Sequence, residues 1–125
     1  MDKTQLRDAA TVIVLRDRKV LMGQRGAKAA FMPGKFVFPG GAVDQDDADI
    51  PTTGLTESCA AQLAQESTLA PRTLATAAIR ELWEETGQIL GRPTTWDTPP
   101  EDWAGFAETG HMPDATGLSF IFRAV

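Results

Sequence analysis

The chain has 125 residues, 42% of them hydrophobic and 23% charged, which fits a single globular domain with one core. Twelve basic against seventeen acidic residues give a formal net charge of −5, which argues against nucleic acid as a partner because such a surface needs extended positive charge. The first residues lack a signal-peptide pattern, and the apolar run at residues 11–15 is too short to span a bilayer. We therefore expect a cytoplasmic protein without membrane contact.

Two apolar, β-branched runs open the chain. They lie at residues 10–15 and 20–22 with a short polar turn between them, a pattern that predicts a β-hairpin. The next stretch, residues 24–35, is rich in Gly, Ala and basic residues. Arg25 and Lys35 within it are candidates for phosphate binding, although a solvated connection has the same composition.

A short strand at residues 36–38 is predicted to run into Pro39, Gly40 and Gly41. Paired glycines let the backbone come close to a ligand and turn a carbonyl group toward a metal ion. Phe38, directly before this turn, is a candidate substrate contact.

The middle of the chain holds an acidic segment and a predicted helix. Residues 44–49 are mostly Asp, which we interpret as a solvated loop, with Asp44 a candidate to support a metal site without binding the ion directly. Residues 56–65 predict a helix capped by Thr56, which we expect to pack over an edge of the sheet. Cys59 is the single cysteine, so an internal disulfide is excluded.

A second, longer helix is predicted over residues 71–86. At helical spacing Glu81, Glu84 and Glu85 share a narrow arc beside the apolar face. These like charges repel one another, and they lie near the C-terminal end of the helix, where its dipole disfavours anions. Arg80 supplies one compensating charge, and clustered carboxylates are ligands that magnesium prefers.

The remainder of the chain contains a break, a short helix and a strand. Gly87 is predicted to end the long helix in a left-handed conformation. Residues 91–100 contain Gly and Pro and indicate a break, and residues 101–109 predict a short helix whose aromatic side chains are buried. The apolar residues 118–125 predict a final strand.

The segment Phe-Pro-Gly-Gly at residues 38–41, followed by Arg-Glu-Leu-Trp-Glu-Glu-Thr-Gly at residues 80–87, resembles the Nudix box. This resemblance implies an α/β fold, an α/β/α sandwich with a mixed β-sheet. Gly41 and Arg80 are 39 positions apart, whereas the family's box has about fourteen, so the box is split by an insertion at about residues 45–70. Gln88 stands where the family has an apolar residue.

The resemblance also implies a divalent-metal-dependent hydrolase that cleaves a diphosphate bond in a nucleoside diphosphate derivative, with Mg²⁺ or Mn²⁺ as cofactor. By motif position, Glu84, Glu85 and the Gly40 carbonyl are metal ligands. Glu81 is a ligand or the general base, and Arg80 orients Glu81.

One branch of the family has the most similar signature. Leu21, Arg25, Gly34 and residues 38–41 match much of the segment that precedes the box in coenzyme A diphosphatases, so coenzyme A or an acyl-CoA is the expected substrate. Ala30 stands where that signature has a second basic residue. The alternatives are a nucleotide-sugar or ADP-ribose diphosphatase and a Nudix fold that senses a nucleotide without cleaving it.

The family's fold continues beyond the strand that residues 118–125 match. The resemblance therefore predicts a single Nudix domain over residues 1–125 without its C-terminal elements. A sheet that ends on so apolar a strand exposes unpaired backbone groups, which favours a homodimer.

Overall fold

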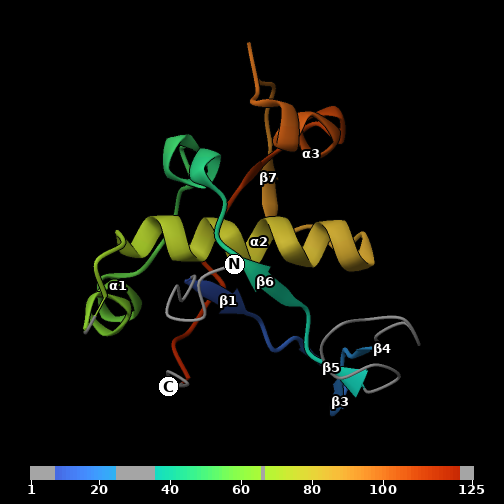
Figure 1. The fold of residues 1–125 in the computed structure, drawn as a ribbon. Coiled ribbons are helices and arrows are strands. Elements are labelled where there is room, and N and C mark those ends of the chain that lie inside the picture. The colour runs from blue at the N-terminus through green and yellow to red at the C-terminus, as the bar shows by residue number, and fades with distance from the viewer. Residues whose placement is uncertain (1–7, 25–35, 66, 122–125) are drawn as a thin grey trace, which may run out of the picture.

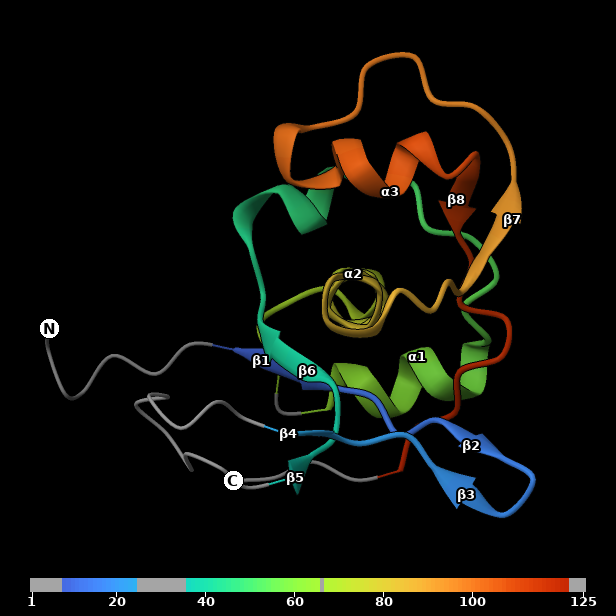
Figure 2. The same cartoon turned by 90° about the vertical axis from the view of Figure 1, so that its right-hand side faces the viewer.

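The computed structural model describes residues 8–24, 36–65 and 67–121 (Figure 1). Its central element is α2 (Pro71–Thr86), which has the predicted bounds and around which the other elements are arranged, as the view down its axis in Figure 2 shows. Pro71 occupies the first turn, where its missing N–H is no loss. Gly87 ends the helix with a φ of 77°, and its N–H donates to the Trp83 carbonyl at 2.8 Å.

One face of α2 builds the larger part of the core. Ala75 and Ile79, one helical turn apart, pack against aromatic side chains from the segment that follows α2. Trp103 and Phe106 are fully buried, which confirms that the aromatic residues of the predicted short helix belong to the core. The buried members of this cluster are Ile50, Ala75, Ile79, Trp103, Phe106 and Ala115.

A second face of α2 covers the N-terminal strands. Ala78 and Leu82, again one turn apart, are buried against Val12, with Val14 and Leu21 packed at the margin of this smaller cluster. The helix is thus buried on two sides, and its residues from Thr73 to Arg80 are all shielded from solvent. A polar side chain in that stretch must find its partners inside the protein.

The strands form four two-stranded antiparallel ladders, which pair β1 with β6, β2 with β3, β4 with β5, and β7 with β8. Among the described residues, parallel pairing is limited to one bridge between Thr53 and Asp114. The predicted α/β class is therefore confirmed, with small ladders in place of one continuous sheet. The bounds are β1 (Ala9–Thr11), β2 (Leu15–Arg16), β3 (Lys19–Val20), β4 (Gly23–Gln24), β5 (Phe36–Val37), β6 (Gly40–Ala42), β7 (Gly91–Pro93) and β8 (His111–Pro113).

The predicted hairpin is present as β2 and β3. Asp17 and Arg18 between them both have positive φ, 52° and 65°, which is the backbone of the tight turn that matches the twist of two antiparallel strands. The ladder is shorter than the apolar runs predicted. The Leu21 N–H still donates to the Val14 carbonyl at 3.0 Å across the hairpin, whereas the Val12 N–H donates to the Pro39 carbonyl at 2.9 Å.

The remaining helices are η1 (Gln45–Asp49), α1 (Glu57–Ala64), η2 (Glu101–Trp103) and α3 (Ala104–Glu108). The predicted helix at residues 56–65 is confirmed as α1, whose N-cap Thr56 accepts the N–H of Cys59 at 3.2 Å. The predicted short helix is confirmed as η2 followed by α3. In the described parts of the chain, no helix is both long and apolar enough to cross a membrane.

The segment between β6 and α2 is more deeply built into the fold than the sequence indicated. We predicted a solvated acidic loop, but η1 packs directly on α2 and Ile50 is 1% exposed. The helix predicted over a sheet edge, α1, also contacts α2, and its position at a sheet edge stays a prediction. Thr52 and Thr76 of α2 share a buried hydroxyl–hydroxyl hydrogen bond of 2.5 Å. This correction has a physical reason, because the buried Arg80 of α2 needs an acidic partner from this segment.

The prediction of a strand at residues 118–125 is wrong for residues 118–121, which form no ladder; residues 122–125 lie outside the described part. Leu118 instead packs its side chain against both core clusters, and its N–H donates to Ala115 at 3.0 Å in a turn. A strand forms earlier in the chain, as β8. It pairs with β7, which lies in the segment where the sequence indicated a break. The homodimer expected through this strand stays a prediction.

Gly105 of α3 offers a test of the core. A Cβ atom there would lie 2.5 Å from the Trp83 ring, so Gly105→Ala should lower the free energy of unfolding by about 1–3 kcal/mol through overpacking. Gly117→Ala is the control, because a Cβ at Gly117 meets nothing within 4 Å. Urea unfolding of both variants measures the difference, and equal stability would contradict the packing described.

Candidate active site

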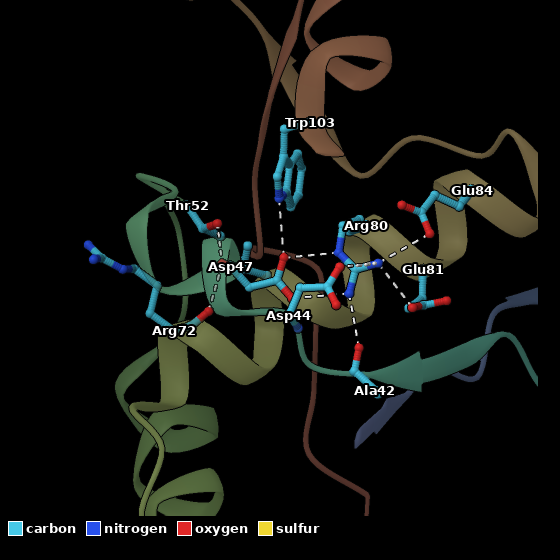
Figure 3. A network of polar contacts seen from close by, with 10 residues as sticks. Ala42, Asp44, Asp47, Thr52, Arg72, Arg80, Glu81, Glu84 and Trp103 are labelled. Atoms are coloured by element: carbon cyan, nitrogen blue, oxygen red, sulfur yellow. Dashed lines mark hydrogen bonds and ion pairs between the residues drawn. The ribbon is translucent and has the colours of Figure 1, made fainter. Parts of the chain in front are cut away.

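Arg80 is the centre of the polar network in Figure 3, and its side chain is only 3% exposed. Its Nε and Nη2 atoms donate to the two carboxylate oxygens of Asp47 at 2.9 and 3.1 Å. Nη2 also donates to the Ala42 carbonyl at 3.0 Å, which ties α2 to the end of β6. Nη1 donates to Glu81 at 3.0 Å and to Glu84 at 3.1 Å. All three guanidinium nitrogens are therefore engaged.

Asp47 is as buried as Arg80, with 1% of the residue exposed. Besides the two bonds from Arg80, its Oδ1 accepts the indole N–H of Trp103 at 3.2 Å and its Oδ2 accepts the backbone N–H of Asp44 at 2.9 Å. Four donors thus satisfy the buried carboxylate, which is the condition under which a buried ion pair can offset its loss of hydration. Segments before and after α2 meet at this one side chain.

Negative charge exceeds positive charge around Arg80. Asp44, Asp47, Glu81 and Glu84 each place an oxygen within 4 Å of the guanidinium, the longest contact being 3.6 Å to Asp44. Burial alone would lower the Arg80 pKa, but the hydrogen bond and charge of Asp47, with the charges of Glu84 and Glu81, raise it above its ordinary value. The guanidinium is therefore permanently charged and still neutralises only one of four acids.

The excess of negative charge affects the pKa values of Glu81 and Glu84. Burial raises the pKa of the Glu81 carboxyl, and the charges of Glu85 and Asp44 add to the rise, while Arg80 opposes it. Burial raises the pKa of Glu84 as well, with Glu81 and Asp44 adding to it against Arg80. The charged form of both carboxyl groups is thus less stable than that of a free glutamate, and an additional cation nearby would stabilise it.

The paired glycines of β6 lie against the same helix. Gly40 donates its backbone N–H to Glu85 Oε2 at 3.1 Å. A Cβ atom on Gly41 would lie 2.6–2.8 Å from the carboxylate atoms of Glu81, and one on Gly40 would lie 2.5 Å from the Ala10 carbonyl oxygen. Only glycine permits this close approach to the protein's own side chains and backbone, and the predicted approach to a ligand stays a prediction.

A cleft of about 560 Å³ opens beside these glycines. Phe38 and Glu85 line it together with Gly40 and Gly41, so the structure brings one predicted substrate contact next to the predicted metal-binding residues. Arg25 and Lys35, the predicted phosphate contacts, lie outside the described residues.

The glutamates do not form a closed metal site. In residues 8–24, 36–65 and 67–121, no three His, Cys, Asp or Glu side chains are arranged to hold a metal ion. Glu81 and Glu84 contact Arg80, and Glu85 contacts Gly40. The donor set nevertheless fits a hard divalent cation, because it consists of carboxylate oxygens with an excess of negative charge.

Asp47 and Trp103 are the network residues that sequence reasoning missed. The signal for Asp47 was present, because a buried Arg inside an apolar helix face requires an acidic partner. The structure shows that Asp47 forms the buried pair. Nothing in the sequence pairs Trp103 with an acid 56 positions away.

The chain was compared with known proteins. No protein-family model matches it. A curated Caenorhabditis elegans protein, whose name places it among the nudix hydrolases, is 38% identical over 94 residues, which cover 74% of this chain and 25% of that protein. The crystal structure of a NUDIX hydrolase from Alicyclobacillus acidocaldarius superposes with a TM-score of 0.62 at 29% identity, covering 90% of this chain and 59% of that one.

The fold, with its glutamate-bearing helix, is that of an α/β protein similar to this solved NUDIX hydrolase. The sequence relative and the structural neighbour are both named as Nudix hydrolases, so the similarity agrees with the resemblance of residues 38–41 and 80–87 to the Nudix box. The chain spans about a quarter of the curated relative's length and about three fifths of the crystallised protein's length.

The buried ion pair can be tested by Asp47→Ala. This change leaves Arg80 buried without its closest partner, so we expect the free energy of unfolding to fall by about 3–5 kcal/mol. Asp49→Ala, on the exposed side of the same short helix, is the control and should change it by less than about 0.5 kcal/mol. Equal losses in the two variants, measured by urea unfolding, would contradict the central role of Asp47.

The raised pKa values predict a pH dependence. A carboxyl whose pKa is higher in the folded than in the unfolded protein binds more protons when folded, so stability falls as pH rises from the unfolded value, about 4.3, to the folded one. In the double variant Glu81→Gln/Glu84→Gln the free energy of unfolding should not decrease over this pH range. Its stability relative to the parent protein should therefore rise as pH increases. Denaturation in chelator-containing buffer measures it, with Glu108→Gln as control. A constant difference across that range would contradict the electrostatic account.

Proposed function

We propose that the protein hydrolyses the diphosphate bond of a nucleoside diphosphate derivative with the help of a divalent cation, Mg²⁺ or Mn²⁺. The observation that carries the proposal is the excess of carboxylate around Arg80, next to paired glycines that approach Glu81 and Glu85. The similarity to Nudix hydrolases supports the same reaction class. Three clustered acids on a largely buried helix destabilise it through charge repulsion, so their presence indicates a functional role.

In this reaction the oxygen of a water molecule forms a bond to phosphorus, the bridging P–O bond breaks, and the leaving phosphate departs with the electron pair. A divalent cation, when bound, supplies positive charge to the phosphate oxygens. Glu84, Glu85 and the Gly40 carbonyl are the proposed groups that hold it. Arg80 fixes the Glu81 and Glu84 carboxylates through its Nη1 atom.

We assign the general-base role to Glu81. Its side chain is 15% exposed, compared with 38% for Glu84, and burial raises the pKa of its carboxyl. A raised pKa brings a carboxylate closer to the range in which it accepts a proton effectively near neutral pH. The hydrogen bond from Arg80 Nη1 to Glu81 Oε1 holds this carboxylate in position.

The finer proposal is that coenzyme A or an acyl-CoA is the substrate. It rests on Leu21, Arg25, Gly34 and the Phe-Pro-Gly-Gly segment, which match much of the signature that precedes the box in coenzyme A diphosphatases. Ala30 departs from that signature, so nucleotide sugars and ADP-ribose belong in the same assay. Arg25→Ala should raise KM more than it lowers kcat if Arg25 binds ground-state phosphate.

Glu85→Gln tests the reaction class. The change removes a charge and almost no volume at an exposed position, so we expect an intact fold and kcat/KM lowered by about 10²-fold or more. Hydrolysis with Mg²⁺ or Mn²⁺ is measured across coenzyme A, acyl-CoA, ADP-ribose and nucleotide sugars. Glu57→Gln on α1 is the matched control and should retain full activity.

Full activity of Glu85→Gln would remove Glu85 from the metal site. Nucleotide binding without hydrolysis by the parent protein, at any concentration of either cation, would favour a non-catalytic nucleotide sensor over the proposed enzyme.

A further inference from the structure

One of the four hydrogen bonds to the Asp47 carboxylate has a different origin from the other three. Each carboxylate oxygen accepts one N–H of the Arg80 guanidinium, on α2. Oδ2 also accepts the backbone N–H of Asp44, which caps η1 and therefore moves together with Asp47. Oδ1 accepts the indole N–H of Trp103 at 3.2 Å, as Figure 3 shows. Of these four donors, Trp103 alone belongs to the segment that follows α2.

Trp103 is held firmly in the core. Its side chain is fully buried. The ring of Phe106 meets it edge-on with the centroids 5.1 Å apart, and the ring of Trp96 stacks on it at 5.9 Å. A buried ring in close contact with two others keeps one rotamer, so its N–H has a fixed direction. The indole therefore fixes the Asp47 carboxylate relative to a part of the core outside η1 and α2.

The orientation of the Asp47 carboxylate sets the orientation of the Arg80 guanidinium. Nε and Nη2 donate to the two carboxylate oxygens, and such a two-point contact between planar groups fixes both planes. The remaining nitrogen, Nη1, then points to Glu81 Oε1 at 3.0 Å and to Glu84 Oε2 at 3.1 Å. A rotation of the Asp47 carboxylate would turn the guanidinium and move Nη1 relative to both glutamates.

A buried indole N–H also needs an acceptor for its own sake. Trp96 shows the simpler solution, because its N–H donates to the backbone carbonyl of His111 at 2.7 Å. Trp103 donates instead to a buried carboxylate, and a hydrogen bond to a charged group is about twice as strong as one between neutral groups. The bond of Trp103 thus does more than satisfy its own N–H, because it restrains the charged group that holds Arg80.

We propose that Trp103 is a positioning residue for the proposed reaction, because its indole N–H holds the Glu81 carboxylate in its reactive orientation through Asp47 and Arg80. The inference rests on the proposed function and extends it to a segment beyond the residues that resemble the Nudix box. Trp103 does not line the cleft beside Glu85. It should therefore affect turnover and not substrate binding.

Trp103→Phe keeps an aromatic ring in the core and removes the N–H. We expect kcat to fall roughly 10- to 100-fold, the usual effect of losing a residue that orients a ligand or catalytic group from behind, and KM to change less than about 2-fold. In ¹⁵N NMR spectra the Arg80 Nε–H signal should shift and exchange faster with water. Replacement of Trp103 by 3-benzothienylalanine, in which sulfur takes the place of the N–H, should give the same results with the packing retained.

Trp96→Phe is the matched control. It removes an indole N–H from the ring that stacks on Trp103, but that N–H donates outside the Arg80 network. The variant should keep the kcat of the parent protein and an unchanged Arg80 Nε–H signal.

An unchanged kcat or an unchanged Arg80 signal in the benzothienylalanine protein would overturn the proposal. An equal fall of kcat in Trp96→Phe would also overturn it and would assign the effect to core packing. These outcomes are separable from the proposed function. Absence of hydrolysis by the parent protein rejects the proposed reaction, and the Arg80 signal in the same variants still decides whether Trp103 holds the guanidinium.

Discussion

The buried ion pair between Arg80 and Asp47 is the constraint on which the rest of the structure depends. Arg80 lies on a helix that is covered on two faces, so its charge can be tolerated only with a partner inside the protein. That partner comes from η1, whose position is in turn fixed by Trp103 and by the backbone of Asp44. The segments before and after α2 are therefore held in place by one carboxylate.

The same constraint organises the site. Two guanidinium nitrogens donate to Asp47, and the third donates to Glu81 and Glu84. The Glu81 carboxylate lies against Gly41 of β6, where only a glycine leaves room for it. The arrangement concentrates more negative charge than Arg80 can neutralise, and burial makes that charge costly. The charged cluster thus makes the protein less stable than neutral or apolar side chains at the same positions would. Such a loss of stability is common at functional sites, where the side chains are selected for chemistry.

Much of this was predictable from the sequence where the signals are local. The bounds of α2 follow from Pro71, Gly87 and an apolar period, and the cap of α1 follows from Thr56. The parts that were not predictable depend on distant pairs. Apolar residues 118–121 look like a strand, yet Leu118 packs against both core clusters, and the Asp-rich segment looks solvated until one of its acids is required by a buried Arg.

We propose that the excess negative charge on α2 attracts a divalent cation. Titration of the protein with Mn²⁺, followed by paramagnetic broadening of the backbone amide signals, tests it most directly. We expect saturable broadening centred on Gly40, Gly41 and Glu85, which is reversed by Mg²⁺ and weakened in Glu85→Gln. Broadening that is absent, or that is spread evenly over the acidic surface and unchanged in that variant, would contradict it.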